Sequence, residues 1–287
     1  QVLLLCLVCV AVLADAHSID DRINSIIAKH SANWKKKVIH HEASPVDKIP
    51  ITGHKCIQDS FVNPMMENAK ARFSSFAKAK GLDTKPKSVE KRATEYQNMQ
   101  FVVDEAKIAG NSADPNRACY STGSTVCLVS DFDNNGNVIC DNYVCESVDI
   151  LSNSLQTFLR ESVMPTLTEI FTEVIQVPVS QGKMKLDADT YEMYNGMCYP
   201  SDVSIPASYT TTGVDGDFVA FVTARPCGDD GTVAYAASCN FEIKDYNAGL
   251  VGRPLAGIIN FCPRYFQQFV SGSYSDFEYM GAVKVAV

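Results

Sequence analysis

The residues best suited to chemistry in this chain form one short stretch, His54-Lys55-Cys56-Ile57-Gln58-Asp59. A cysteine thiolate is a strong zinc ligand, and a catalytic zinc keeps one tetrahedral position open for water. Cys56 could fill that position and hold a zinc enzyme inactive, and the neighbouring His54 and Lys55 favour the thiolate form. A second interpretation stays open, in which Cys56 forms a disulfide with a cysteine outside this sequence.

Other catalytic or metal-binding arrangements find less support in the sequence. A nucleophilic pair of Cys56 and His54 is disfavoured, because catalytic partners usually lie far apart in sequence and are brought together by the fold. No histidine follows His54, so the rest of the chain offers no imidazole for a zinc site. Residues 131–137 resemble the start of a calcium-binding loop, but position 12 is Asn142 instead of the bidentate glutamate, which favours a hairpin turn.

The first 16 residues predict a secretory signal peptide. Val2–Leu13 is an unbroken apolar run, and Ala14-Asp15-Ala16 is a small-x-small site at which cleavage after Ala16 makes His17 the new N-terminus. The run is shorter than the roughly 20 residues that a spanning helix needs. A buried apolar helix is the alternative. We therefore expect a secreted or cell-surface protein, whose cysteines meet an oxidising compartment and form disulfides.

Charge and cysteines both divide the chain near residue 98. Residues 17–98 carry 15 Lys and Arg against 9 Asp and Glu, whereas residues 99–287 carry 10 against 23. The net charge of −8 argues against a nucleic-acid partner, which requires a basic surface. The basic leader could dock on the acidic body, although a solvated basic face is the alternative. We expect a signal peptide (1–16), a leader (17–98) and a body (99–287).

Hydrophobic periodicity predicts a mixture of helices and strands. Ser18-Ile19-Asp20-Asp21 resembles a capping box that opens a helix towards Lys37, and residues 61–80 are a second helical candidate. Val126–Cys145 reads as a hairpin that turns at Asp133–Gly136. Val148–Val174 follows a helical pattern that Pro165 should kink or restart. The remaining predicted strands are Met99–Val103, Asp217–Ala224, Val233–Cys239 and Ala256–Phe261.

Several of these segments resemble the leishmanolysin (surface metalloprotease, metzincin) family in that family's order. His54, Cys56 and Asp59 match its propeptide cysteine switch, whereas Lys55 and Gln58 depart from it. The similar segments of the body are Cys145–Leu151, Val177–Gly182, Asp217–Cys227, Ala234–Cys239 and Gly252–Pro263. The resemblance implies an α/β (α+β) fold, with a mixed twisted sheet and long helices in a metzincin-like N-terminal catalytic subdomain behind a helical propeptide.

The resemblance also implies a set of disulfides. It pairs Cys127 with Cys145 and Cys198 with Cys239, which leaves Cys119 with Cys140 and Cys227 with Cys262. All eight body cysteines are then used, and Cys56 remains as the inhibitory zinc ligand of the intact zymogen.

The family's zinc site itself is missing from the sequence. Metzincins carry two zinc-binding histidines and a general-base glutamate on one helix as H-E-x-x-H, which follows the segment similar to Tyr274–Tyr279. Here the chain continues as Met280–Val287 without a histidine. We expect zinc in the intact parent enzyme, with protein or peptide substrates, and neither catalytic zinc nor proteolysis in this stretch alone. The alternative is a non-catalytic secreted module for adhesion or protein binding.

Overall fold

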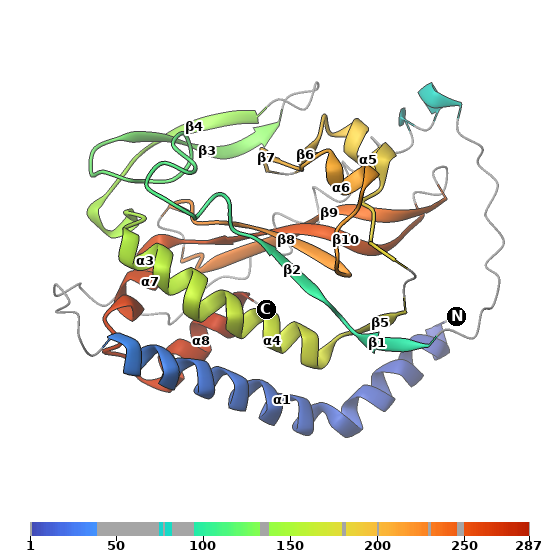
Figure 1. Ribbon diagram of the computed structural model, residues 1–287, viewed down its shortest axis with the longest axis horizontal. Coiled ribbons are helices and arrows are strands. Elements are labelled where there is room, and N and C mark those ends of the chain that lie inside the picture. Colours follow the sequence, from blue (N-terminus) through green and yellow to red (C-terminus); the bar gives the residue numbers. More distant parts are fainter. Residues whose placement is uncertain are drawn as a thin grey trace.

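The structure, a computed structural model, describes residues 2–38, 75–76, 78–81, 95–132, 138–179, 182–199, 201–228, 231–245 and 250–286. Its architecture is a mixed sheet between a layer of helices and a layer of short elements (Figure 1). The helices are α1 (Val2–Val38), α3 (Asn153–Phe158), α4 (Met164–Val174), α5 (Ala188–Met193), α6 (Ser208–Thr211), α7 (Pro263–Val270) and α8 (Asp276–Ala286). The strands are β1 (Tyr96–Asn98), β2 (Phe101–Asp104), β3 (Thr125–Phe132), β4 (Val138–Val144), β5 (Gln176–Pro178), β6 (Met197–Cys198), β7 (Val203–Ser204), β8 (Phe218–Thr223), β9 (Ala234–Asp245) and β10 (Leu250–Phe261).

The main sheet has the strand order β2-β8-β10-β9. Strands β2, β8 and β10 run parallel, and β9 pairs antiparallel with β10 at one edge. The predicted mixed helix and strand content is therefore confirmed, and the three predicted strands of residues 217–261 are β8, β9 and β10. The strand predicted at Met99–Val103 is β2, shifted by two residues at its start.

Side chains alternate between the two faces of the sheet, and each face packs into its own hydrophobic core. In β8, Ala220 and Val222 face the helical layer, where they join the core of α3, α4, α7 and α8. Val219 and Phe221 face the other way and pack with residues from the segment around α5 to β7, such as Leu186 and Ile205. Because both faces of β8 are covered, its sequence is an almost continuous apolar run.

The helix predicted from Ser18 is longer than expected. α1 begins at Val2 and passes through the expected cleavage site between Ala16 and His17. The capping box at Ser18 is therefore wrong as a helix start, because no proline or glycine interrupts residues 2–38 and the backbone is already helical there. Its expected end near Lys37 agrees with the observed end at Val38. Among the described residues, no helix combines the length and apolar character needed to cross a membrane.

The long helical pattern of residues 148–174 is interrupted twice. Val148 lies in the 3₁₀ turn η2 (Ser147–Asp149), and α3 begins only after Ser152, whose hydroxyl accepts a hydrogen bond from the Leu155 amide. A π-helical turn, η3 (Leu159–Val163), then leads into α4, with Pro165 in its first turn. The predicted restart at Pro165 is confirmed, because proline lacks the amide hydrogen that an uninterrupted helix would use.

The predicted hairpin is present as β3 and β4, whose pairing runs from Thr125 with Val144 to Phe132 with Val138. The expected turn at Asp133–Gly136 lies outside the described residues, as does most of the helix expected at 61–80. The short strands β1 and β5 pair with each other and were not expected. A three-residue strand shows too little alternation to be recognised.

Candidate functional site

Helix α8 begins at Asp276, inside the segment Tyr274–Tyr279 after which the resemblance implies a zinc-binding helix. Ser275 and Glu278 start it with a reciprocal capping box: the Ser275 amide donates to the Glu278 carboxylate at 2.7 Å, and the Glu278 amide donates to the Ser275 hydroxyl at 3.2 Å. Ala282 and Val283 are fully buried against the helical core. The first turns of α8 are therefore fixed at both their cap and their inner face.

Tyr279 holds α8 against the π-helical turn. Its ring is fully buried, and its hydroxyl lies 3.0 Å from Ser162 Oγ and 3.1 Å from Thr166 Oγ1. Burial raises the pKa of the Tyr279 phenol, so the group stays neutral and hydrogen-bonded. Sequence reasoning missed this contact, because Ser162 and Thr166 look like ordinary polar positions of a helix.

The outer edge of the sheet is formed by β9. Within the described residues no further strand pairs with β9. The first half of the strand contains the small residues Ala234, Ala236, Ala237 and Ser238. The disulfide Cys198–Cys239 fixes the middle of the strand. An edge strand with small side chains and a fixed backbone can accept an extended peptide as an additional strand.

The described residues do not provide a zinc site. They contain no group of three His, Cys, Asp or Glu side chains arranged to bind a metal ion. Their two histidines, His17 and His30, both lie in α1. Cys56 and His54 lie outside the described residues, so the predicted switch stays a prediction. The side chains of the described residues thus do not fit a catalytic zinc.

The four disulfides use the expected cysteines but two pairings differ. Cys198–Cys239 and Cys227–Cys262 agree with the expectation. The expected pairs Cys127–Cys145 and Cys119–Cys140 are wrong, because the structure joins Cys119 to Cys145 and Cys127 to Cys140.

Strand register explains the exchange of partners. In the hairpin, Cys127 lies opposite Asn142 and Val129 lies opposite Cys140, so Cys127 and Cys140 are diagonal neighbours. Cys145 directly follows the end of β4. Cys119 forms an isolated β-bridge with Ile150, five residues after Cys145, and this pairing brings Cys119 close to Cys145.

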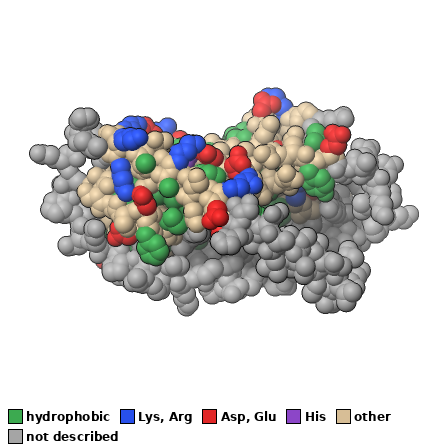
Figure 2. Space-filling view, turned by 90° about the horizontal axis from the view of Figure 1, so that it is seen from below, with side chains coloured by type: hydrophobic (Ala, Val, Ile, Leu, Met, Phe, Trp, Pro, Cys, Tyr) green, Lys and Arg blue, Asp and Glu red, His purple; other side chains and the backbone are tan. Residues whose placement is uncertain are grey.

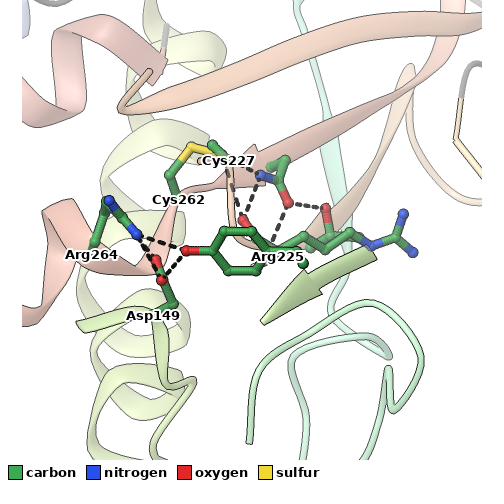
Figure 3. Close-up of a disulfide and its surroundings, with 8 residues drawn as sticks. Asp149, Arg225, Cys227, Cys262 and Arg264 are labelled. Carbon is green, nitrogen blue, oxygen red and sulfur yellow. Dashed lines mark hydrogen bonds and ion pairs between the residues drawn. A yellow bond between two sulfur atoms is a disulfide. The ribbon is translucent and has the colours of Figure 1, made fainter. Parts of the chain in front are cut away.

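Two clusters of buried ion pairs lie on either side of the disulfide Cys227–Cys262 (Figure 3). Arg264, in the first turn of α7, points toward Asp149 beside the disulfide Cys227–Cys262 (Figure 3). On the other side of that disulfide, the Arg225 guanidinium extends away and binds Asp114 at 2.7 Å and Asp202 at 2.8 Å. Burial alone would raise the pKa of Asp202, but Arg225 and Arg117 outweigh it and lower the pKa below its ordinary value. Asp114 and Asp202 both pair with Arg225 and are therefore structural groups of this cluster.

Asn260 connects the Arg225 segment to the sheet. It is fully buried in β10, and its side-chain oxygen accepts hydrogen bonds from the Arg225 amide at 2.9 Å and from Thr223 Oγ1 at 2.8 Å. Its amide donates to the Arg225 carbonyl at 3.2 Å. The turn after β8 is thus held by one side chain of β10.

Comparison with known proteins shows which family this chain is similar to. A family model of peptidases described as leishmanolysin (Peptidase_M8) matches residues 49–276. The leishmanolysin of Leishmania major is 30% identical over 117 residues, which are 40% of this chain and 17% of that protein. The leishmanolysins of Leishmania tropica and Leishmania chagasi are each 29% identical over similar lengths, with 16% and 17% of those proteins aligned. The aligned part is thus about a sixth of these relatives' length. The chain belongs to the leishmanolysin family of peptidases.

Proposed function

We propose that this chain is the front part of the precursor of a secreted or cell-surface zinc metalloendopeptidase. In this proposal residues 1–16 are a signal peptide, 17–98 a propeptide and 99–287 the beginning of the protease domain. The family match over residues 49–276 carries the proposal. The mixed sheet and the helix α8 that follows it are in keeping with the metzincin-like subdomain that the resemblance implies.

Cys56 is the proposed inhibitory zinc ligand of the intact zymogen. The four disulfides occupy all eight cysteines after residue 98, so none of these competes for Cys56. A thiolate from the propeptide would then displace the zinc-bound water until the propeptide is removed.

The outer edge of β9 is the proposed site for substrate. A peptide paired with this edge would be held in extended form by main-chain hydrogen bonds, which place little restriction on its side chains. Protein and peptide substrates are therefore the proposed partners.

The proposal predicts that this stretch alone neither binds catalytic zinc nor cleaves peptides, since its histidines all precede residue 55. The test measures zinc content and casein cleavage for the purified chain, and then for the product of the transcript read beyond Val287. We expect no activity from the chain, and an H-E-x-x-H motif with zinc-dependent cleavage from the longer product. In the longer product, Cys56→Ser should activate the uncleaved precursor.

Two results would contradict the proposal. Casein cleavage by the chain itself would show that another site does the chemistry. A transcript that stops after Val287 would instead favour a non-catalytic secreted module for adhesion or protein binding.

A further inference from the structure

Helix α1 lies along the outer side of the helical layer, beneath α4 and α8 in Figure 1. Residues 22–37 of α1, which lie beyond the expected signal cleavage site, make side-chain contacts with the body. This part of α1 contributes to the main hydrophobic core through Ile26, Ile27 and Trp34. α1 is therefore packed as a component of the fold.

Trp34 is the principal apolar contact of α1. It is only 6% exposed, and its ring meets Phe158 edge-to-face at 5.1 Å between centroids. Its indole N–H donates to the Phe269 carbonyl at 3.2 Å. A buried tryptophan that also satisfies its polar atom is the kind of residue that dominates the free energy of an interface.

A row of basic residues on α1 faces a row of carboxylates on the body. Arg22 pairs with Glu173 at 2.7 Å and Lys29 with Glu169 at 2.8 Å, and Lys37 pairs with Glu161. Steps of seven and eight residues return to one side of a helix after two turns, so these three bases share a flank of α1. Their partners descend in number as α1 ascends, so α1 runs antiparallel to α4.

Three more contacts extend the row. Lys35 pairs with Asp276 at 2.7 Å, and Ser31 donates to the same carboxylate at 2.8 Å. His30 lies 2.8 Å from Glu169, beside Lys29. Figure 2, which views the molecule from the α1 side, shows Lys and Arg side chains next to Asp and Glu side chains on this face.

We propose that the body carries a specific docking site for α1, which keeps the helix bound after the chain is cut between α1 and the body. We call it the α1 docking surface, and it consists of Phe158, Glu161, Glu169, Glu173, Phe269 and Asp276. Trp34 and the charge pairs join α1 to this surface directly. None of these contacts involves the residues that connect α1 to the body. Loss of the covalent connection lowers the effective concentration of α1 but removes none of these contacts.

The two kinds of contact have different roles. Partly exposed ion pairs contribute little each and are screened by salt, so the charge row governs the salt dependence and the orientation of α1. Trp34 and the two isoleucines are shielded from water and govern how long α1 stays bound. Cutting the leader would therefore leave a two-chain complex, and α1 would be removed in a separate step. This inference goes beyond the proposed function and needs no zinc.

The test uses the full chain with a specific protease site inserted between residues 41 and 48, so that the released piece contains α1 alone. After cutting in native buffer, gel filtration shows whether the α1 piece elutes with the body. We expect co-elution at physiological salt. Trp34→Ala should raise the dissociation constant by at least tenfold. Lys29→Ala should weaken retention at low salt and make it less sensitive to salt, because one screened ion pair is lost.

Lys36 provides the matched control. It is exposed on the same helix and has no ion-pair partner among the described residues, so Lys36→Ala should leave retention unchanged. If Trp34→Ala does not fold, the exchanged pair Lys29→Glu with Glu169→Lys replaces it: each single change should weaken retention, and the double variant should restore it.

The proposal is overturned if the cut wild-type α1 piece elutes apart from a folded body. It is equally overturned if Trp34→Ala, or each single charge exchange, retains α1 as well as the wild type does. Neither result affects the proposed zinc peptidase activity, because that activity is measured by zinc content and cleavage.

Discussion

Arg264 and Asp149, 115 residues apart in sequence, form a two-point ion pair: the guanidinium donates to the two carboxylate oxygens at 2.9 and 2.8 Å. Asp149 is fully buried and Arg264 is 8% exposed. Tyr143 completes the group, since it also bonds Asp149 at 2.5 Å, and burial together with this hydrogen bond raises the pKa of its phenol well above the ordinary value. The pair ties the base of the β3–β4 hairpin and η2 to the start of α7.

Replacing Asp149 by Asn should destabilise the protein by about 3–5 kcal/mol, because it removes the buried counter-charge of Arg264 and leaves the exposed Glu146 beside it. Chemical denaturation with the disulfides intact measures this free energy of unfolding. Glu105→Gln is the control, since Glu105 pairs with the exposed Arg160 and its loss should cost about 1 kcal/mol or less. Equal losses for the two variants would contradict a structural role for the buried pair.

Tyr279→Phe should cost about 1 kcal/mol, because it removes the hydroxyl that binds Ser162 and Thr166 but keeps the ring. Tyr279→Ala should cost about 4 kcal/mol by opening a cavity in the core. Phe277→Ala, on the same helix but 83% exposed, should change little. Denaturation curves give the three values, and a Phe277 effect as large as that of Tyr279→Ala would mean that α8 is packed differently.

Acid should loosen α1. The hydrogen bond from Lys29 lowers the pKa of Glu169 below its ordinary 4.5, against the opposing effect of burial, and His30 adds to it. Hydrogen bonds from Lys35 and then Ser31 lower the pKa of Asp276 below 3.8. Carboxylates with lowered pKa values stabilise docking at any pH above their ordinary pKa. This contribution is lost as the pH falls below about 4. His30 Nε2 also faces Glu169, at 2.8 Å.

Trp34 is the only tryptophan, so its fluorescence reports directly on docking. Its emission should shift to longer wavelength as the pH falls below about 4, when water reaches the indole. The double variant Glu169→Gln, Asp276→Asn should lose most of this pH dependence. An acid transition of unchanged size in that variant would assign it to other groups.

Cys56 should be the reactive thiol of the folded chain once the proposed signal peptide, residues 1–16, has been removed. A thiol reagent followed by peptide mapping without reduction should label Cys56 and leave the eight body cysteines unlabelled. The same map should contain peptides joined by Cys119–Cys145 and Cys127–Cys140. Finding Cys56 in a disulfide would exclude a role as a zinc ligand.

The strands of residues 217–261 could be predicted because both sides of the sheet are covered, which makes β8 apolar throughout and gives β10 a long apolar end. The family resemblance supplied the cysteine set but not all the pairings, since spacing along the chain does not reveal a diagonal neighbour across a hairpin. The start of α1 was misplaced because a local cap signal at Ser18 competes with a sequence that is helical on both sides of it.

Contacts between distant segments were the least predictable. The charge division near residue 98 suggested that the leader could dock, but it could not assign Arg22 to Glu173 or Lys29 to Glu169, because many carboxylates are available to each base. The pairing of Asp149 with Arg264 was equally hidden, since a lone acidic or basic residue in sequence gives no indication of burial.

The parallel pairing of β2 with β8 also constrains how the chain folds. Phe101 in β2 lies opposite Phe218 in β8. Strand β2 therefore cannot pair with its neighbour until more than 110 further residues have been synthesised. The β3–β4 hairpin lies within that interval, and its cross-link between Cys127 and Cys140 spans only 13 residues. Local structure can therefore form and oxidise early, whereas closure of the sheet is a late and slow event, as expected for contacts between distant parts of a chain.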